Sequence, residues 1–197
     1  MSPSPAPSPA PSPGAKRPLR ERVLDAAERV VTRDGAAHLT LDAVVAEAGV
    51  SKGGMLYHFR SKEALLQGLL ARTLERHMAR VADLRAALPD DAAHGAGRAH
   101  LAACIERQPV EREFGLTLIA AAAHNPDLLA PGRKVLEETA AAMRDLEAEV
   151  PTARLLWLSM HGLHFLDILG ISPLTDDEKT ELRAQAHRIL TETGDSR

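Results

Sequence analysis

The stretch Thr40–Glu63, which decides the fold of this chain, reads TLDAVVAEAGVSKGGMLYHFRSKE. Thr40 and Ser51 each precede a short run of helical periodicity, where a hydroxyl group is suited to capping the first turn. Gly49 lies between the two runs and permits a tight reversal, because glycine adopts positive φ without steric cost. Helix, short glycine-containing turn and helix is the layout of a helix-turn-helix. The stretch therefore predicts a helix that enters a groove of DNA.

Helical patterns continue on both sides of this stretch. Before it, a helix is expected from Pro18, which suits a first helical position, to Asp34-Gly35. After it, Ser61 is expected to cap a long helix over residues 62–87, followed by a loop over residues 90–97. Five further helices are expected over residues 98–107, 111–124, 131–149, 151–170 and 175–192, the last of them opening with a capping box at Thr175–Glu178.

This pattern predicts an all-α fold in three parts. Residues 1–15, rich in Ser, Pro and Ala, are predicted to be a disordered tail, because they cannot bury enough surface to offset ordering. Residues 16–63 are predicted to form a helix-turn-helix DNA-binding domain of three helices. Residues 64–197 are predicted to form a second, helical domain, for which the family resemblance described below implies effector binding and dimerisation.

Composition narrows the compartment and the partners. The chain has 197 residues, of which 45% are apolar and only 3% aromatic, a balance that favours helices over sheets. Its single cysteine, Cys104, excludes a disulfide within the chain and suits a reducing cytoplasm. No apolar run reaches the length of a membrane span, and the first residues lack the apolar core of a signal peptide. We therefore expect a cytoplasmic protein without a membrane partner.

Charge is divided unevenly along the chain. Residues 15–63 carry nine Lys/Arg and seven Asp/Glu, whereas residues 64–197 carry fifteen and twenty. A mildly basic front and an acidic back suit a protein that touches an anion with one end only. Lys16, Arg17 and Arg20 are either a flexible basic arm for a neighbouring DNA groove or ordinary solubilising charges.

The segment Gly49–Leu65 resembles the amino-terminal signature of the TetR (tetracycline-repressor) family of bacterial transcription regulators. The resemblance covers about residues 19–66, from the first helix and its Asp-Gly end to the Tyr-His-Phe-Arg-Ser-Lys-Glu exit at 57–63. It implies a homodimeric repressor that binds palindromic operator DNA and is released by a small molecule. The dimer is expected to form through helices 151–170 and 175–192. The alternatives are an activator of the same family and a ligand-independent architectural DNA-binding protein.

The resemblance also implies individual DNA contacts. Carried over position by position, it assigns phosphate contacts to Thr40, Ser51, Tyr57, His58 and Lys62. Lys52 is the expected base reader, since a lysine at the start of the recognition helix reaches guanine acceptors in the major groove. Met55 and Phe59 are expected to face the core of the module.

Two features of the recognition helix depart from a dense reading face. Gly53 and Gly54 remove two side chains from that face, although they permit close backbone approach to DNA. The family often has tyrosine where this chain has Leu56, which either meets a thymine methyl group or packs internally. We therefore expect specificity to rest on Lys52, Tyr57 and DNA shape.

One helix of the back half carries an unusual set of side chains. Trp157, His161, His164 and Asp167 are spaced by four, three and three residues, which places the first three on one helical face. Three interpretations stay open: a wall of a ligand pocket, a dimer seam, or a metal site with His-x-x-His-x-x-Asp spacing.

The remaining pocket residues are selected only by size and softness. The candidate effector-binding residues are Met78, Cys104, Phe114, Leu118, Met143, Trp157, His161 and His164, and each is alternatively ordinary core. Few polar groups occur among them, so a lipophilic effector is expected. Cys104 as a redox sensor would need a lowered pKa. No catalytic triad, phosphate-binding glycine loop or carboxylate pair is evident, so neither an enzyme nor a cofactor is expected.

Overall fold

The computed structural model describes residues 17–35, 38–90, 92–106 and 112–192, apart from the side chains of residues 112–114. Over these ranges the regular elements are helices, which confirms the all-α prediction, and none of them is long and apolar enough to cross a membrane. The predicted tail over residues 1–15 lies outside the described residues. The elements are α1 (Leu19–Asp34), α2 (Leu41–Ala48), α3 (Lys52–His58), α4 (Lys62–Ala86), α5 (Gly95–Ile105), α6 (Arg112–His124), the 3-10 helix η2 (Pro126–Leu129), α7 (Ala130–Leu146), α8 (Ala153–Leu169) and α9 (Asp176–Glu192).

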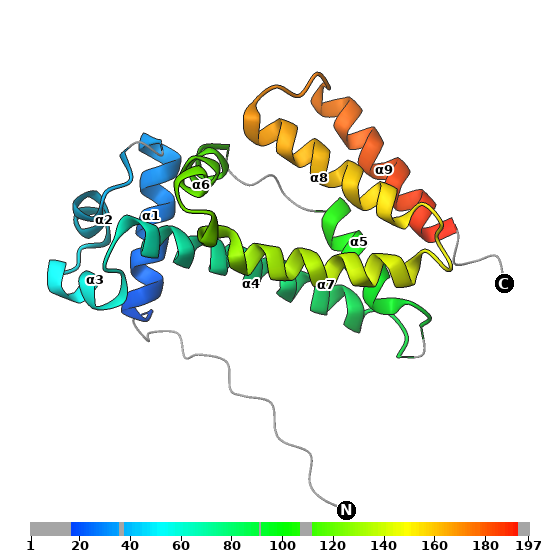
Figure 1. Cartoon of the computed structure of the whole chain (residues 1–197), viewed down its shortest axis with the longest axis horizontal. Helices are drawn as coiled ribbons and strands as arrows, with labels where there is room; N and C mark the ends of the chain where they lie inside the picture. Colours follow the sequence, from blue (N-terminus) through cyan, green and yellow to red (C-terminus); the bar gives the residue numbers. More distant parts are fainter. Residues whose placement is uncertain (1–16, 36–37, 91, 107–111, 193–197) are drawn as a thin grey trace, which may run out of the picture.

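The helices form a front unit and a longer back half that share α4. Helices α1, α2 and α3 gather at one end of the molecule, and α4 runs from this end along its length with α7 beside it (Figure 1). Helix α5 contacts α4, α7, α8 and α9, and is therefore the centre of the back half. Helix α6 and η2 return to the front, where they contact α1 and α4 respectively.

The helix starts of the front unit are capped as the sequence predicts. The backbone N–H groups of Ala43, Gly54 and Ala64 donate to the hydroxyl oxygens of Thr40, Ser51 and Ser61, each at 3.1 Å. Each cap satisfies one of the amide donors that the first turn of a helix leaves without a partner. Gly49 ends α2 in the left-handed region, with φ 62° and ψ 41°. These local bonds fix the angle at which α3 leaves α2.

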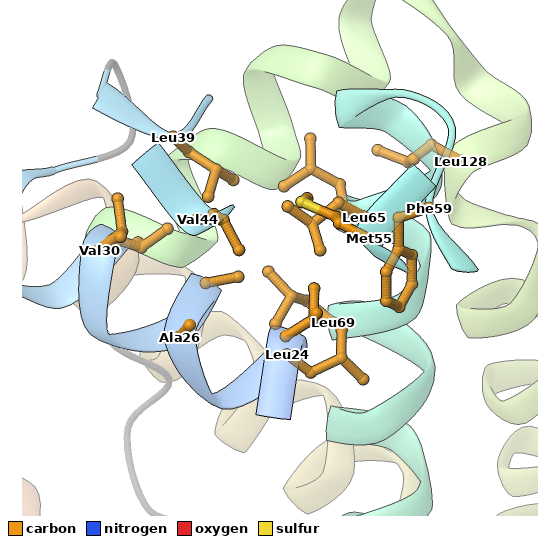
Figure 2. Close-up of a cluster of buried hydrophobic side chains, with 14 residues drawn as sticks. Leu24, Ala26, Val30, Leu39, Val44, Met55, Phe59, Leu65, Leu69 and Leu128 are labelled. Atoms are coloured by element: carbon orange, nitrogen blue, oxygen red, sulfur yellow. The ribbon is translucent and has the colours of Figure 1, made fainter. Parts of the chain in front are cut away.

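A closed apolar core holds the front unit together. Fourteen buried side chains make up this core (Figure 2). They come from α1, α2, α3, the first half of α4 and η2, together with Leu39 before α2 and Phe59 after α3. Leu24, Leu39 and Leu65 are completely buried, and each such leucine contributes about 1.5–3 kcal/mol. Leu128 of η2 is also completely buried here, so a residue of the back half completes the front core.

Several helix boundaries differ from the expectation by a few residues; α7, for example, ends at Leu146 and α8 begins at Ala153. Helix α5 begins at Gly95, so the predicted loop over residues 90–97 is wrong at its end. Gly97 lets α5 approach α7 closely, because an added Cβ would lie 2.7 Å from both the Ala142 carbonyl oxygen and Leu146 Cβ. At the start of α1, Pro18 precedes the first helical residue instead of occupying that position.

Candidate DNA-binding surface and ligand cavity

Helix α3 has one buried face and one open face. Met55 is completely buried and Phe59 is 4% exposed, which confirms the prediction that both face the core. On the open side, Tyr57 is 82% exposed and meets the His58 ring edge-on, with ring centroids 5.1 Å apart. Lys52 is also exposed. The face therefore presents one cation and two hydrogen-bonding rings to the surroundings.

The other predicted phosphate contacts lie at the starts of helices. Thr40 and Ser51 are exposed at the N-termini of α2 and α3, and Lys62 is half-buried at the N-terminus of α4. Helix N-termini favour anions, because their free N–H groups and the helix dipole both point at the ligand. The arrangement is thus chemically suited to phosphate, while the individual contacts stay predictions.

The two glycines of α3 play different parts. A Cβ at Gly53 would meet nothing within 4 Å, so this position is open and permits close approach of a partner. A Cβ at Gly54 would lie 3.1 Å from Ser51 Oγ and 3.3 Å from Leu19 Cδ2. Gly54 thus faces α1 and the capping hydroxyl. The expectation that both glycines thin the reading face is corrected to Gly53 alone.

Sequence reasoning missed an ion pair at the start of α3. Lys52 Nζ lies 2.8 Å from Asp42 Oδ1, and both side chains are well exposed. A surface ion pair of this kind contributes little to stability, because water and salt screen it. DNA could therefore replace Asp42 as the partner of Lys52 at a small cost in free energy. The i to i+10 separation across a turn gave no periodic signal for this contact.

A buried arginine joins α4 to α1. The side chain of Arg72 is 7% exposed, and its guanidinium lies 2.6 Å from Asp25 Oδ1 and 2.7 Å from Glu28 Oε1. Burial raises the pKa of Asp25, but hydrogen bonds and charges from Arg72 and Arg17 outweigh it and leave the pKa below its usual 3.8. The cluster thus holds α4 against the front unit by charge as well as by packing.

Four helices of the back half border a partly open cavity of about 180 Å³. Helices α4, α5, α7 and α8 each contribute to its wall. The lining residues are Leu74, His77, His100, Cys104, Gly132, Val135, Leu136, Thr139, Trp157 and His161.

The structure brings together only some of the predicted effector residues. Cys104, Trp157 and His161 line the cavity, and His164 joins Cys104 and His161 around a small neighbouring pocket. Met143 is instead completely buried in the core of the back half, and Leu118 packs against the front core. Met78 is half-buried and is not part of the described lining, and the side chain of Phe114 lies outside the described residues.

Hydrogen bonds fix the protonation of the polar groups in the wall. His161 Nδ1 lies 2.9 Å from the Trp157 carbonyl oxygen, which can only accept, so this nitrogen carries the hydrogen. Cys104 Sγ lies 3.4 Å from the same nitrogen. Thr139 donates its hydroxyl hydrogen to the Val135 carbonyl at 2.8 Å, so its oxygen accepts from His100 Nδ1 at 3.3 Å.

Two further polar groups of the wall are desolvated. Burial lowers the pKa of His100 below its usual 6.5, and the charge of Glu138 offsets this only in part. The ring is therefore neutral at pH 7. The indole Nε1 of Trp157 is buried and has no hydrogen-bond partner in the described part of the chain.

The three interpretations of the α8 histidines are narrowed by Asp167. Its carboxylate lies 2.8 Å from Lys179 Nζ of α9, and both side chains are largely buried. The hydrogen bond that Lys179 donates to Asp167 raises the pKa of Lys179 despite partial desolvation. Asp167 is thus part of the α8–α9 contact, and no group of three His, Cys, Asp or Glu side chains able to hold a metal ion occurs among the described residues. The structure does not bring His161, His164 and Asp167 together as a set of metal ligands.

Two family models match separate parts of the chain. Residues 23–69 match the bacterial regulatory proteins of the tetR family, and residues 94–191 match the tetracyclin repressor-like C-terminal domain. The HTH-type transcriptional regulator UidR of Escherichia coli K12 is 34% identical over 64 residues, and TtgR of Pseudomonas putida is 38% identical over 58 residues. These matches cover 32% and 29% of this chain and only 33% and 28% of the curated relatives' lengths.

Solved structures extend the likeness over most of the chain. A member of the TetR family from Streptomyces coelicolor A3 is 30% identical, with a TM-score of 0.58, over 87% of this chain and 97% of its own. The multidrug binding protein EbrR, solved with imidazole, is 29% identical, with a TM-score of 0.53, over 88% of this chain and 96% of its own. With both family models matched in order and one relative aligned almost end to end, the chain belongs to the TetR family of bacterial transcription regulators.

Proposed function

We propose that this chain is a homodimeric repressor that binds a palindromic operator through two copies of α3 and releases it when a small molecule occupies the cavity. The observation that carries this proposal is the placement of α4. Its first half supplies Leu65 and Leu69 to the closed front core, and its second half supplies Leu74 and His77 to the cavity wall. One helix therefore takes part in both the DNA-reading unit and the cavity.

The chemistry of the front unit supports DNA binding by many phosphate contacts and few base contacts. Thr40 and Ser51 use an oxygen lone pair for capping, so the hydroxyl hydrogen of each can still donate to a phosphate. Tyr57 and His58 add exposed donors. Phosphate contacts set register, whereas base contacts specify sequence, and Lys52 is the one long donor on the open face of α3.

The outer face of α8 supports dimerisation. Leu155, Leu158 and Phe165 are 65%, 59% and 51% exposed. With Gly162 and Leu169 they recur at alternating spacings of three and four residues, which is typical of a seam between two helices. A row of exposed apolar groups of this kind marks a protein interface. Helix α9, which contacts α8, is expected to extend the same interface.

A second connection supports ligand-controlled release. Leu128 of η2 is buried in the front core, and α7 begins directly after η2. Gly132, Val135 and Leu136 of the first turns of α7 line the cavity. A ligand that displaces α7 would therefore act on the front core through Leu128 as well as through α4. The shift in DNA affinity can be no larger than the preference of the ligand for the released state.

The nature of the cavity supports a lipophilic effector. Within the described lining no Asp, Glu, Lys or Arg reaches the cavity. Burial of a charged ligand without a counter-charge is costly, so a neutral molecule is favoured. The related EbrR, described as a multidrug binding protein, was solved with the small ring compound imidazole.

The test is selection of binding sites from random DNA by the full-length protein, followed by footprinting with and without lipophilic compounds. We expect protection of two half-sites about 34 Å apart or a little more, lost when an effector is added. A reporter gene downstream of the selected site should be repressed. Weak sequence preference without any ligand response would indicate an architectural protein, and increased reporter expression would indicate an activator.

Two variants sharpen this test. Phe165→Glu should give a folded monomer that no longer protects both half-sites, as checked by light scattering. Lys52→Ala should remove roughly 1–3 kcal/mol of discrimination between operator and random DNA. An equal loss of affinity for both DNAs would instead make Lys52 a phosphate contact.

A further inference from the structure

The wall of the cavity identifies the chemical class of its ligand. Two flexible leucines, one valine and the rigid indole of Trp157 form the apolar part, and imidazoles, a thiol and a hydroxyl form the polar part. An engineered apolar cavity of about 150 Å³ binds benzene. The present volume of about 180 Å³ is therefore that of one ring with a small substituent.

His100 supplies a hydrogen-bond acceptor to the ligand. Its Nδ1 is occupied by the Thr139 oxygen at 3.3 Å and carries the hydrogen, since Thr139 spends its own hydrogen on the Val135 carbonyl. A neutral imidazole with hydrogen on Nδ1 has its lone pair on Nε2. His100 lines the cavity and its Nδ1 is engaged, so Nε2 is the nitrogen left for a ligand. A ligand with a hydroxyl hydrogen matches this acceptor.

Trp157 supplies a second, independent observation. Its Nε1 is buried and lacks a partner in the part of the chain that the structure describes, and a buried donor of this kind is unfavourable until an acceptor reaches it. A hydroxyl group is neutral and both donates and accepts. It therefore suits the acceptor that His100 offers on α5 and the uncharged wall around it.

We infer that the cavity binds a neutral phenol with a single ring, whose ring packs on Trp157 and whose hydroxyl donates to His100 Nε2. The inference rests on the proposed effector function of this cavity. A phenol, like tyrosine, has a pKa of about 10, so it is neutral at pH 7 and enters the cavity without ionising. The corresponding methyl ether has the same ring but cannot donate, and it is the matched ligand for comparison.

The experiment uses the full chain without DNA. Trp157 is the only tryptophan, so its fluorescence, excited where phenols do not absorb, reports occupancy of the cavity directly. We expect 4-methylphenol to bind about tenfold more tightly than 4-methylanisole, because the ether leaves the His100 acceptor unpaired. Benzoate and benzylammonium should bind more weakly than either neutral compound.

The variant His100→Phe keeps a ring in the wall but removes the acceptor, and it should bring the ratio of the two affinities to about one. His124→Phe, on α6 outside the lining, should leave the ratio unchanged. Equal binding of phenol and ether by the wild type would overturn the inference even if the His100 variant failed to fold. Tightest binding of benzoate, or no fluorescence or calorimetric response to any ring compound, would overturn it as well.

A separate arm distinguishes this inference from the proposed function. Fluorescence anisotropy of labelled operator DNA is followed during addition of 4-methylphenol. Tight binding to Trp157 without release of DNA would uphold the ligand class and contradict ligand-controlled release. If charged or larger compounds release the DNA and do not compete with 4-methylphenol for binding, ligand-controlled release is supported and the proposed ligand class is contradicted.

Discussion

The two halves of α4 lie in opposite surroundings. Around its first half the front core is closed, and Leu65, Leu66 and Leu69 are at most 1% exposed. Around its second half, Leu74 and His77 border a cavity. A closed core holds the capped helices in one arrangement, since tightly packed interiors deform little. A region that contains a cavity can be filled in more than one way. This difference suits the proposed roles of a rigid DNA-binding unit and an adaptable ligand-binding region.

The largest change in stability is expected when one apolar side chain is removed from each region. Leu69→Ala should lower the free energy of unfolding by about 3 kcal/mol, because the closed front core cannot collapse onto the space that is left. Val135→Ala, in the cavity wall, should cost about 1 kcal/mol, since it enlarges a space that already exists. Urea unfolding at one protein concentration measures both. Equal losses would show that the back half is as closely packed as the front.

A smaller effect is expected at the charged contact between α4 and α1. Arg72→Met should cost about 2 kcal/mol, because it leaves Asp25 and Glu28 without their buried partner, although both carboxylates retain some access to water. Arg76→Met is the matched control on the same helix. Arg76 is 61% exposed, and its loss should cost about 0.5 kcal/mol or less. Similar losses in both variants would show that burial of Arg72 adds nothing.

The same contact predicts a dependence on pH. The pKa of Asp25 is lower in the folded protein than its usual 3.8, so its ionised form stabilises the fold. This contribution is complete above the unfolded pKa and is lost as the pH falls through the folded pKa. Unfolding curves from neutral pH to about pH 3 should therefore show a smaller acid-induced loss in Arg72→Met than in the wild type.

Local features of the fold were predictable from the sequence, and the orientation of whole helices was not. The caps at Thr40 and Ser51 and the box at Thr175 depend on residues three positions apart, and the structure contains them. Leu128, by contrast, enters the front core from a distant element, and only tertiary structure reveals that contact.

Helix α7 shows the same limit for the cavity. Met143 has the size and softness of a pocket residue, but the rotation of α7 places it in the core, while Val135 and Leu136 line the cavity. Periodicity defines an apolar stripe on a helix. It does not say which part of that stripe meets another side chain and which part borders a space.

The smallest expected effects concern one glycine in each region. A Cβ at Gly68 of α4 would lie 2.6 Å from Phe59 Cε1 and 3.1 Å from Leu24 Cδ2. Gly68→Ala should therefore destabilise the chain by about 1 kcal/mol, as overpacking of the front core exceeds the gain in helix propensity. A Cβ at Gly162 of α8 would meet nothing within 4 Å, so Gly162→Ala should stabilise the monomer by roughly 0.5–1 kcal/mol.

The Gly162 variant also probes the outer face of α8, because Gly162 lies in the row of exposed apolar residues. Unfolding at low protein concentration and light scattering at high concentration separate its effects on the monomer and the dimer. Stabilised monomers that dimerise less well would mean that two copies of α8 approach closely at Gly162. Unchanged dimerisation would place the closest approach elsewhere on α8, and destabilised monomers would contradict the open surroundings of this glycine.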